Sequence, residues 1–503
     1  MSAVTLRELL HAAPDDAVAL CAPQRPALRY AALRALIADT IAGLNRLGIG
    51  RNDRAAIVLP NGPEMAAAFI AVAAGATTAP LNPAYRAEEF KFYLEDLNAR
   101  ALLVETGSTS PARDVASELG VPVYEIAVEE DAPAGAFTLP TGDHTISHGG
   151  PAAPEDTALV LHTSGTTSRP KIVPLSHTNI CASARHIGAS LALTPDDRCL
   201  NIMPLFHIHG LIAAVLSSLA AGGSVYCTPG FNALRVFSWL EDAAPTWYTA
   251  VPTMHQAILA RAARHAELIN RLALRLIRSS SSSLPPQVMA ELEAAFGCPV
   301  IEAYGMTEAA HQMTSNPLPP AARKPGAVGL PAGPEVAIMN ADGQLLADGE
   351  IGEVVIRGPN VTAGYESNPG ANADAFSAGW FRTGDQGVID ADGYLALTGR
   401  LKEIINRGGE KISPREVDEV LLDHPAVAQA VTFAVPHDKL GEEVAAAVVL
   451  REGAQASADE LRGFAAVRLA DFKVPRQVLI LEEIPKGATG KVQRIGLHEK
   501  LGL

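Results

Sequence analysis

"LRLIRSSSSSLPPQVMAELEAAFGCPVIEAYGMTE", residues Leu274–Glu308, contains a strand, a loop, a helix and a second strand in succession. The apolar run Leu274–Ile277 predicts the first strand, and Ser279–Ser283 predicts the loop after it. Prolines at the first turn and Gly297 at the end are typical of a helix between them. Val300–Ala303 predicts the second strand. Strands that alternate with helices in this way indicate an α/β fold with parallel sheets.

Two other stretches follow the same scheme. RAAIVLPNGPEMAAAFIAVAAGATTAPLN (Arg54–Asn82) predicts a strand, a buried helix and a strand, and its apolar part is too short to span a membrane. TALVLHT (Thr157–Thr163) predicts another strand, and a helix is expected after His177. We therefore place the hydroxyl-rich loop after Thr163 between a strand and a helix, at the edge where open α/β sheets bind ligands.

The chain has 503 residues, more than one hydrophobic core usually organises, so several domains are expected. After about residue 325, short alternating runs with DG and PG turns predict antiparallel β structure. Glu410–Val435 then predicts a helix with a Ser-Pro start and a strand. We predict an N-terminal domain (1–399) of two α/β subdomains and a β-rich subdomain (about 325–399), followed by a small α+β C-terminal domain (400–503).

Composition and charge exclude several classes of protein. The formal net charge of −15 argues against a nucleic-acid or anionic-membrane partner, because such partners require a basic surface. The five cysteines include no CxxC pair, so neither a disulfide framework nor a zinc site is indicated. No secretory signal is visible, and the final Leu-Gly-Leu is no peroxisomal tripeptide. A cytoplasmic location is expected.

The hydroxyl-rich loop TSGTTSRPK (Thr163–Lys171) has the composition of an anion site. Its backbone N–H groups and hydroxyls are donors, Gly165 permits the close approach of a phosphate, and Lys171 adds a positive charge. The glycine spacing differs from that of the GxxxxGK[ST] nucleotide loop. The alternative is an ordinary surface turn rich in serine and threonine.

Three further motifs could contribute to a nucleotide site. In YGMTE (Tyr304–Glu308) a hydroxyl and a carboxylate could share Mg²⁺ with phosphates, although a solvated glutamate is the simpler interpretation. Asp385 of TGD could accept both ribose hydroxyls, with an ordinary turn aspartate as the alternative. Lys491 of PKGATGK lies in a glycine-rich tail, where a lysine usually only increases solubility.

A fifth motif is TGRLKEIINRGGEKISPREVDEV (Thr398–Val420). In order and spacing, the five motifs resemble those of the adenylate-forming enzymes. This family includes acyl-CoA synthetases, luciferases and the adenylation domains of peptide synthetases. The resemblance covers essentially the whole chain. It implies an AMP-forming ligase that uses ATP, Mg²⁺ and coenzyme A, with a mobile C-terminal domain. One departure is Ser168, which stands where the family usually has a second glycine.

The resemblance also implies roles for individual residues. The ATP phosphates are expected at Thr163, Ser164, Gly165, Thr166, Thr167 and Lys171, and Mg²⁺ at Thr163 and Glu308. Adenine and ribose are expected at Ser281, Ser282, Ser283, Glu302, Ala303, Tyr304, Asp385 and Arg400. Lys491 is expected to bridge the acid carboxylate and the α-phosphate, so the catalytic residues are Lys491, Glu308 and Thr163. The hinge is expected at Lys402, with Gly408 and Gly409 along the path of the CoA thiol.

Within this family, the chain is most similar to the oxalyl-CoA synthetases of plants and fungi. Three stretches carry this similarity: the serine run Ser279–Ser283, EAYGMTEAAHQMTSNPLPP (Glu302–Pro320) and NRGGEKISPREVDEVLLDHP (Asn406–Pro425). This resemblance implies that the acid is a small dicarboxylate, with oxalate the first choice. The second carboxylate stays charged at neutral pH, so burying it requires hydrogen-bond donors. We expect the acid site at His207, Ser280, Ser281, Gly305 and His311.

Several alternatives remain open. A broad-range short- or medium-chain acyl-CoA synthetase would have the same nucleotide motifs, and a carrier-protein ligase would share the first half-reaction. A catalytically silent adenylate-binding relative is disfavoured because Lys491, Glu308 and Asp385 are all present. Metal binding by the HxH pair, His207 and His209, is disfavoured because no cysteine or acidic residue lies at a suitable spacing. Ala303 argues against malonate, because malonate-specific relatives tend to place an arginine there.

Overall fold

The computed structural model describes residues 4–11, 13–163, 170–485 and 492–503. These residues belong to two compact units. The first contains Met1–Thr163, Lys171–Glu335 and Arg357–Asp374, and the second contains Pro170, Val336–Ile356 and Ala375–Leu503. The segment Arg357–Asp374 thus belongs to the first unit, although the segments on both sides of it belong to the second.

One sheet of the first unit has six strands in the order β6-β5-β3-β4-β7-β8. The strands are β3 (Arg54–Val58), β4 (Thr77–Pro80), β5 (Ala101–Glu105), β6 (Val123–Ile126), β7 (Thr157–Thr163) and β8 (Lys171–Ser176). All neighbours from β6 to β7 are parallel. Helix α3 (Pro63–Ala73) connects β3 to β4 and is buried apart from Glu64. The strand–helix–strand unit predicted for Arg54–Asn82 is confirmed.

The prediction that the hydroxyl-rich loop leads from a strand to a helix is wrong. The chain that leaves β7 at Thr163 returns as β8, antiparallel to β7, with Thr163 opposite Lys171. Only then does α6 (His177–Ser190) begin, with Ser176 as its N-cap. Pro174 obscured this strand in the sequence, because proline is rare in strands. It is tolerated here because β8 is the edge strand of its sheet.

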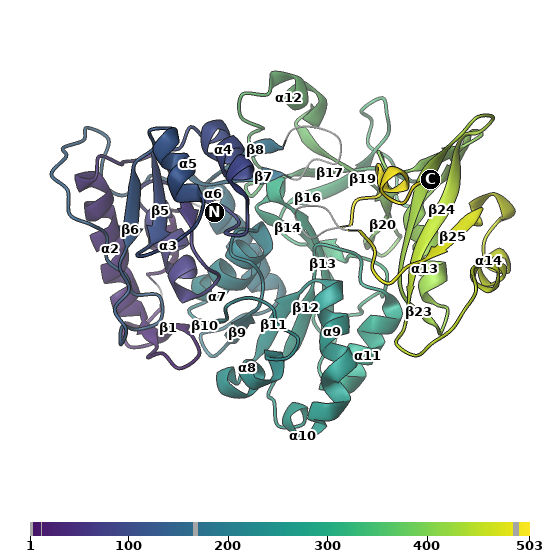
Figure 1. Cartoon of the computed structure of the whole chain (residues 1–503), viewed down its shortest axis with the longest axis horizontal. Coiled ribbons are helices and arrows are strands. Elements are labelled where there is room, and N and C mark those ends of the chain that lie inside the picture. Colours follow the sequence, from purple (N-terminus) through teal and green to yellow (C-terminus); the bar gives the residue numbers. More distant parts are fainter. Residues whose placement is uncertain (1–3, 12, 164–169, 486–491) are drawn as a thin grey trace. The chain divides into compact units, whose positions relative to one another are not determined.

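A nine-stranded sheet in the order β15-β14-β13-β12-β11-β9-β10-β1-β2 organises the rest of the first unit. Its strands are β1 (Val18–Cys21), β2 (Leu28–Arg29), β9 (Arg198–Asn201), β10 (Ser224–Cys227), β11 (Trp247–Ala250), β12 (Leu276–Ser279), β13 (Val300–Met306), β14 (His311–Ser315) and β15 (Leu330–Pro331). From β13 to β1 all neighbours are parallel, and β1 joins β10 from far away in the sequence (Figure 1). The predicted α/β fold class is confirmed.

The helices around this sheet enclose a large apolar core. Side chains of α8 (Val236–Ala243), α9 (Pro252–Ala262) and α11 (Pro286–Phe296) pack with those of the central strands. Helix α11 has proline at its start and Gly297 as its cap with φ +68°, as the sequence predicted. The other helices of the first unit are α1 (Leu6–Leu9), α2 (Tyr30–Arg46), α4 (Ala87–Asp96), α5 (Ala112–Glu118), η1 (His209–Leu216), α7 (Ser217–Ala220), η2 (Ala263–His265), α10 (Ala266–Ile269) and η3 (Thr307–Ala309). No helix in the described part of the chain has the length and apolar character that a membrane crossing requires.

The second unit contains two further sheets. The β-rich segment forms the predicted antiparallel sheet from β16 (Glu335–Met339), β17 (Gly352–Arg357), β18 (Phe376–Ser377), β19 (Trp380–Ile389) and β20 (Leu395–Arg400). Helix α12 (Pro369–Ala375) precedes β18 and belongs to the first unit as far as Asp374. The C-terminal sheet contains β21 (Ile405–Arg407), β22 (Glu410–Ile412), β23 (Val427–His437), β24 (Gly441–Leu450) and β25 (Gln477–Ile480). Its helical elements are α13 (Pro414–Leu422), α14 (Ala458–Ala466), η4 (Asp471–Lys473) and α15 (Leu497–Lys500). The helix and strand predicted within Glu410–Val435 correspond to α13 and β23.

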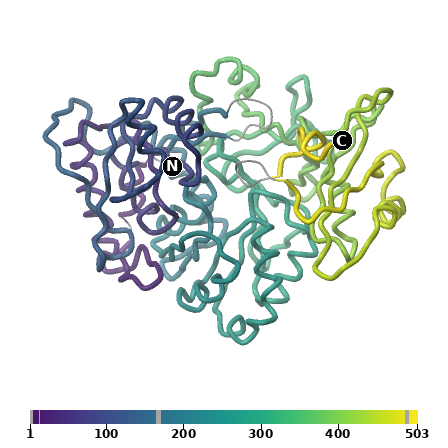
Figure 2. The backbone as a smooth tube through the Cα atoms, in the orientation of Figure 1, coloured from purple at the N-terminus to yellow at the C-terminus, as the bar shows by residue number. Residues whose placement is uncertain are grey.

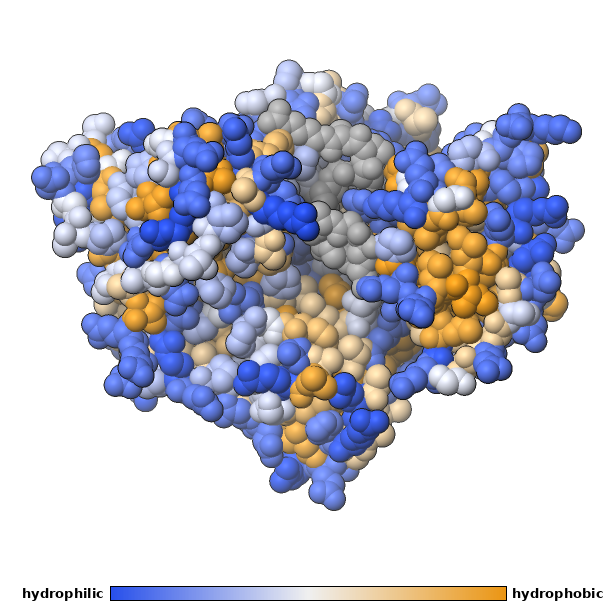
Figure 3. All heavy atoms as spheres, in the orientation of Figure 1, coloured by the Kyte–Doolittle hydropathy of each residue, from blue (hydrophilic) through white to orange (hydrophobic). Residues whose placement is uncertain are grey.

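The C-terminal end of the chain folds back on this last sheet (Figure 2). Leu497 of α15 packs with Phe433 of β23 in a small apolar cluster. Hydrophobic residues also gather on the surface over β24 and β25 (Figure 3). Lys402, the predicted hinge, lies in an exposed turn between β20 and β21, and both the hinge and the boundary at residues 399–400 remain predictions.

A buried charge cluster stabilises the C-terminal sheet. Arg494 pairs with Asp418 of α13 at 2.6 Å and with Glu403 at 3.3 Å, and it donates to the Thr432 carbonyl at 2.8 Å. Asp418 is only 6% exposed, and its other oxygen accepts from the Thr432 N–H at 2.5 Å. Because a carboxylate buried without a counter-charge is costly, Arg494 is required once Asp418 is buried.

We predict that Arg494→Met lowers the free energy of unfolding of this sheet by about 3–5 kcal/mol, because it leaves Asp418 buried and unpaired. Hydrogen exchange of β23 and β24 amides measures the effect. Arg462→Met is the control, because the partner of Arg462, Asp459, is 92% exposed and such pairs contribute at most about 1 kcal/mol. Equal hydrogen-exchange rates of the β23 and β24 amides in Arg494→Met and Arg462→Met would contradict the prediction.

Candidate active site

The carboxyl ends of the parallel strands of the nine-stranded sheet lie at one edge, where α/β sheets bind ligands. Thr249 near the end of β11 and Ser281 after β12 both belong to this edge. The π-helix η1 begins at the same place with His209, and all eight of its residues are buried. Short π-helical turns often occur at functional sites. Polar side chains from three separate segments are thereby brought together.

His209 is the centre of this polar cluster and is fully buried. Its Nδ1 is 3.0 Å from Ser281 Oγ, and its Nε2 is 2.6 Å from Thr249 Oγ1. Its ring also stacks on His311, with 4.9 Å between the ring centroids and 28° between the planes. The structure therefore brings together two predicted residues, Ser281 and His311, and joins them through His209.

Two residues of the cluster have unusual backbone conformations. Ser281 has φ +71° and His311 has φ +99°, in the left-handed region that residues with a side chain rarely adopt. Such strain costs of order 1–3 kcal/mol per residue and concentrates at functional sites, where the surrounding structure maintains it. Both strained residues contact His209, so the strain coincides with the polar cluster.

Gly305 was predicted to contact the acid, and the structure shows a further reason for a glycine there. A Cβ atom built on Gly305 would lie 1.5 Å from the carbonyl oxygen of His311. Strands β13 and β14 pair at this point with an irregular register. Any side chain at position 305 would force the two strands apart and move the His311 ring away from His209.

The other predicted acid residues have local partners. Ser280 is fully buried, and its hydroxyl donates to the Ala303 carbonyl at 2.9 Å, which connects the loop after β12 to β13. His207 is half-buried, and its Nδ1 accepts from the backbone N–H of His209 at 3.3 Å. Sequence reasoning did not assign His209 to the acid site, because the spacing does not show which imidazole of the pair His207 and His209 points inward.

The residues predicted for Mg²⁺ and phosphate form a second group in the first unit. Glu308 of η3 is 5% exposed, and one of its carboxylate oxygens accepts from the Tyr365 hydroxyl at 2.8 Å. Lys171 Nζ lies 4.3 Å from the centroid of the Tyr365 ring, and Lys171 is opposite Thr163 in the β7–β8 pair. Burial and the neighbouring Glu308 together raise the pKa of Tyr365, so its hydroxyl stays a donor.

These groups fit a magnesium site, because Mg²⁺ in proteins prefers one or two carboxylates beside phosphate oxygens. Glu308 would supply the carboxylate and Thr163 a hydroxyl. Tyr365 was missed by sequence reasoning, because only the fold brings it to Glu308. Ser164, Gly165, Thr166, Thr167 and Lys491 lie outside the described residues. Among the described residues, no three His, Cys, Asp or Glu side chains gather as a metal-binding group.

The residues predicted for adenine lie on the loop after β12 and on β13. Glu302 is buried, and its Oε1 accepts from the Leu284 N–H at 3.1 Å, which fixes the end of the serine loop. Ser282 is exposed and Ser283 is half-buried, while Ala303 and Tyr304 are buried in β13. Their placement is compatible with an adenine site, which remains a prediction.

The residues predicted for ribose and CoA belong to the second unit. Asp385 and Arg400 face each other across β19 and β20, with 3.2 Å between Arg400 Nε and an Asp385 oxygen. Gly408 and Gly409 form the two-residue turn between β21 and β22, with φ of +61° and +100°. This conformation favours glycine at both positions.

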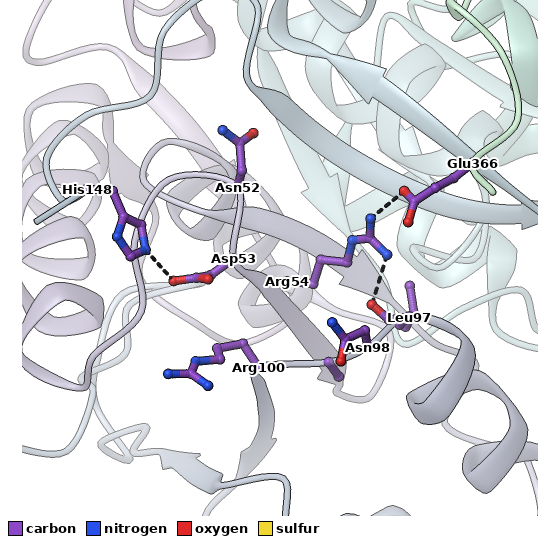
Figure 4. Close-up of a pocket in the computed structure, with 9 residues that line it drawn as sticks. Asn52, Asp53, Arg54, Leu97, Asn98, Arg100, His148 and Glu366 are labelled. Atoms are coloured by element: carbon purple, nitrogen blue, oxygen red, sulfur yellow. Dashed lines mark hydrogen bonds and ion pairs between the residues drawn. The ribbon is translucent and has the colours of Figure 1, made fainter. Parts of the chain in front are cut away.

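A polar pocket elsewhere in the first unit lacks the chemistry of the predicted site (Figure 4). It lies where β3 and β5 begin, at the amino rather than the carboxyl ends of the strands. Its charges are largely paired, because Asp53 contacts His148 at 2.9 Å and Arg54 forms an ion pair with Glu366. None of the predicted site residues lines it.

Comparison with known proteins identifies the family. A family model described as "AMP-binding enzyme" matches residues 6–366, and a second, "AMP-binding enzyme C-terminal domain", matches residues 416–491. The chain belongs to the AMP-binding enzyme family. The predicted resemblance to the adenylate-forming enzymes is confirmed, and the chain is an AMP-forming acid–CoA ligase.

Individual relatives are similar over most of their length. The chain is 48% identical to the oxalate–CoA ligase of Arabidopsis thaliana over 453 residues, which cover 89% of this chain and 88% of the relative. It is 44% identical to the oxalate–CoA ligase of Saccharomyces cerevisiae over 471 residues, with 88% and 86% covered. The O-succinylbenzoate CoA synthetase structure from Bacillus subtilis in complex with ATP and magnesium ion has a TM-score of 0.83, 30% identity and 98% of each chain covered.

We predict that Tyr365→Phe weakens the use of Mg²⁺ and ATP. Partners that orient a metal ligand typically contribute about 10- to 100-fold in metal affinity or activity, so we expect a loss of that size in kcat/KM for MgATP. Mg²⁺ titrations at fixed ATP provide the measurement. Tyr124→Phe is the control, because it also removes a tyrosine hydrogen bond, to the Leu47 carbonyl, but on β6, at the opposite edge of the six-stranded sheet from β8 and Lys171. An unchanged Mg²⁺ dependence in Tyr365→Phe would refute the prediction.

Proposed function

We propose that this enzyme activates oxalate with ATP and transfers the oxalyl group to coenzyme A. The observation that supports this most directly is the buried cluster of Ser281, His209 and His311 at the carboxyl edge of the nine-stranded sheet. Two oxalate–CoA ligases that are 44–48% identical to the chain support the same substrate.

The chemistry proceeds in two displacements. A carboxylate oxygen of the acid attacks the α-phosphorus of ATP, the bond to the β-phosphate oxygen breaks, and pyrophosphate leaves. The CoA thiolate then attacks the carbonyl carbon of the acyl-adenylate and AMP leaves. Magnesium, when bound, neutralises phosphate charge during the first displacement.

We assign the steps to residues of this chain as follows. Lys491 offsets the charge of the two anions that approach each other in the first step, an electrostatic contribution that is often the largest in catalysis. Lys171 binds the outer phosphates, and Asp385 holds the ribose. Rotation near Lys402 then brings Gly408 and Gly409 to the thiol, because one site must serve two different reactions.

The acid cluster suits a dicarboxylate better than a fatty acid. Oxalate carries two charges at neutral pH, and its second carboxylate has no role in the reaction, so it must be solvated by the protein. The half-buried Ser281 offers a hydroxyl beside the buried imidazoles of His209 and His311. A long apolar acid would offer no acceptor to the Ser281 hydroxyl, so the broad-range acyl-CoA synthetase is the weaker candidate.

We also propose that the enzyme acts in the cytoplasm. All five cysteines are free, and four of them are buried. Proteins of reducing compartments typically keep their cysteines in this state.

We predict that oxalate is the preferred acid when AMP formation is measured with ATP, Mg²⁺ and CoA. Its kcat/KM should exceed those of acetate, malonate and octanoate by at least about 100-fold, because a site built for polar groups discriminates strongly against acids that lack them. Lys491→Ala should abolish adenylate formation, and Lys486→Ala in the same motif is the control. Equal or higher activity with acetate or octanoate would exclude the oxalate proposal and leave the ligase class unaffected.

Substitutions at Ser281 should separate its hydroxyl from its strained backbone. Ser281→Ala removes the hydroxyl and keeps a side chain at φ +71°, whereas Ser281→Gly removes the hydroxyl and relieves strain of about 1–2 kcal/mol. Because hydrogen bonds to charged groups contribute about 1.5–3 kcal/mol, both variants should raise the KM for oxalate by roughly 10- to 100-fold. Ser281→Gly should nevertheless melt at a temperature equal to or above that of the wild type. Wild-type KM values in both variants would remove Ser281 from the acid site.

A further inference from the structure

We propose that Arg278 sets the preference for a dicarboxylate, acting on the acid site through Thr249, His209 and Ser281. This inference rests on the proposed function, because it assumes that the acid binds at Ser281. It assigns a positioning residue and not a catalytic one, since three side chains separate Arg278 from the expected position of the acid.

Arg278 is a buried cation with little compensation. It lies in β12 with a relative exposure of 0%. Its two hydrogen bonds are long and go to neutral groups, at 3.5 Å to Thr249 Oγ1 and at 3.3 Å to Gln312 Oε1. Its Nε has no hydrogen-bond partner among the described residues. No carboxylate of the described chain forms an ion pair with it, unlike Arg275, which contacts Asp197 at 3.0 Å in the same segment.

A buried arginine without a carboxylate is rare, because the loss of hydration is normally offset by a paired anion. Burial lowers the pKa of Arg278 to about 9, which still leaves the guanidinium charged at neutral pH. The positive charge therefore persists in a low-dielectric region next to the acid cluster. A second carboxylate bound at Ser281 would supply the missing negative charge.

The hydrogen bonds give this charge a path to the acid. Because Arg278 can only donate, Thr249 Oγ1 accepts from it, and the Thr249 hydroxyl proton is directed to His209 Nε2. His209 then carries its proton on Nδ1 and donates to Ser281 Oγ at 3.0 Å. The Ser281 hydroxyl proton is thereby available for an anion. Arg278 thus orients every hydrogen bond of the path through Thr249 and His209, so that the Ser281 hydroxyl at its end is a donor.

Gln312 holds the other side of the guanidinium. Its Oε1 faces Arg278, so its Nε2 donates to Ser190 Oγ at 3.0 Å and to the Ala332 carbonyl at 3.1 Å. Gln312 directly follows His311 on β14, so the segment that carries the stacked imidazole also positions the charge. A neutral amide orients Arg278 without cancelling its charge, whereas a glutamate at this position would cancel it.

Arg278→Met tests the inference. We expect the KM for oxalate to rise about 10- to 100-fold and the KM for ATP to stay within about 2-fold, because only the acid site loses charge and polarity. The ratio of kcat/KM for oxalate to that for acetate should fall by a similar factor. Arg278→Lys should restore part of the ratio, since it returns the charge without the planar fork.

Two further variants separate selectivity from folding. Arg275→Gln, three residues earlier, removes a charge that Asp197 already neutralises, so it should lower stability without changing the oxalate-to-acetate ratio. Gln312→Glu keeps Arg278 but pairs it, so it should lower the ratio even if Arg278→Met does not fold. In ¹⁵N NMR spectra, His209 Nε2 should be unprotonated in the wild type, and its tautomer preference should weaken in Arg278→Met.

The outcomes are distinct. If the wild type does not use oxalate, the proposed function fails at that point. If the wild type uses oxalate but Gln312→Glu and any folded Arg278 variant keep the wild-type ratio, Arg278 is only a structural residue and this inference is overturned. The inference is supported if the oxalate-to-acetate ratio of kcat/KM falls in Gln312→Glu and in a folded Arg278 variant while Arg275→Gln keeps the wild-type ratio.

Discussion

The candidate acid site depends on one backbone contact, the close approach of β13 and β14 at Gly305 and His311. Only a residue without a side chain permits it, because a Cβ at position 305 would overlap the His311 carbonyl. The contact fixes His311 at φ +99° and places its ring on His209. The irregular pairing of the two strands is a feature of the same contact. Steric exclusion between two backbones thus determines where the imidazoles lie, and the hydrogen bonds of the site are built on that arrangement.

Apart from Ser281, the polar cluster is held by helices and strands. His209 begins a buried π-helix, Thr249 and Arg278 lie in central parallel strands, and His311 begins an antiparallel strand of the same sheet. Buried polar groups are costly when they lack partners, and a chain of donors and acceptors avoids that cost. In the acid site that we propose, the Ser281 hydroxyl at its end is the donor to the ligand. The site therefore needs no mobile loop to become polar. Its positive character is present before the acid arrives, as electrostatic preorganisation requires.

Much of this structure could be predicted from the sequence. Apolar runs and glycine or proline boundaries predicted β3, α3 and β4 and the strands on both sides of α11, because local pattern determines such elements. The strand β8 was missed, since its proline is acceptable only at a sheet edge, and edges are not visible in sequence. Ser281 and His311 were predicted from resemblance. His209, Thr249 and Arg278 could not be placed, because alternate residues of a strand or π-helix point in different directions and no local pattern reveals which side chains meet.

The segment Arg357–Asp374 has a consequence for how the protein is made. It returns to the first unit after the chain has already entered the second, and it supplies Tyr365 to Glu308 and Thr362 to the backbone of β8 and η3. A nascent chain that has emerged only as far as β16 contains both large sheets, yet Glu308 still lacks its tyrosine. Glu308, the predicted Mg²⁺ ligand, thus gains its tyrosine partner late in synthesis, after part of the following unit has been translated. A chain that ends before Arg357 would therefore contain the strands of both large sheets but not the tyrosine that hydrogen-bonds to Glu308.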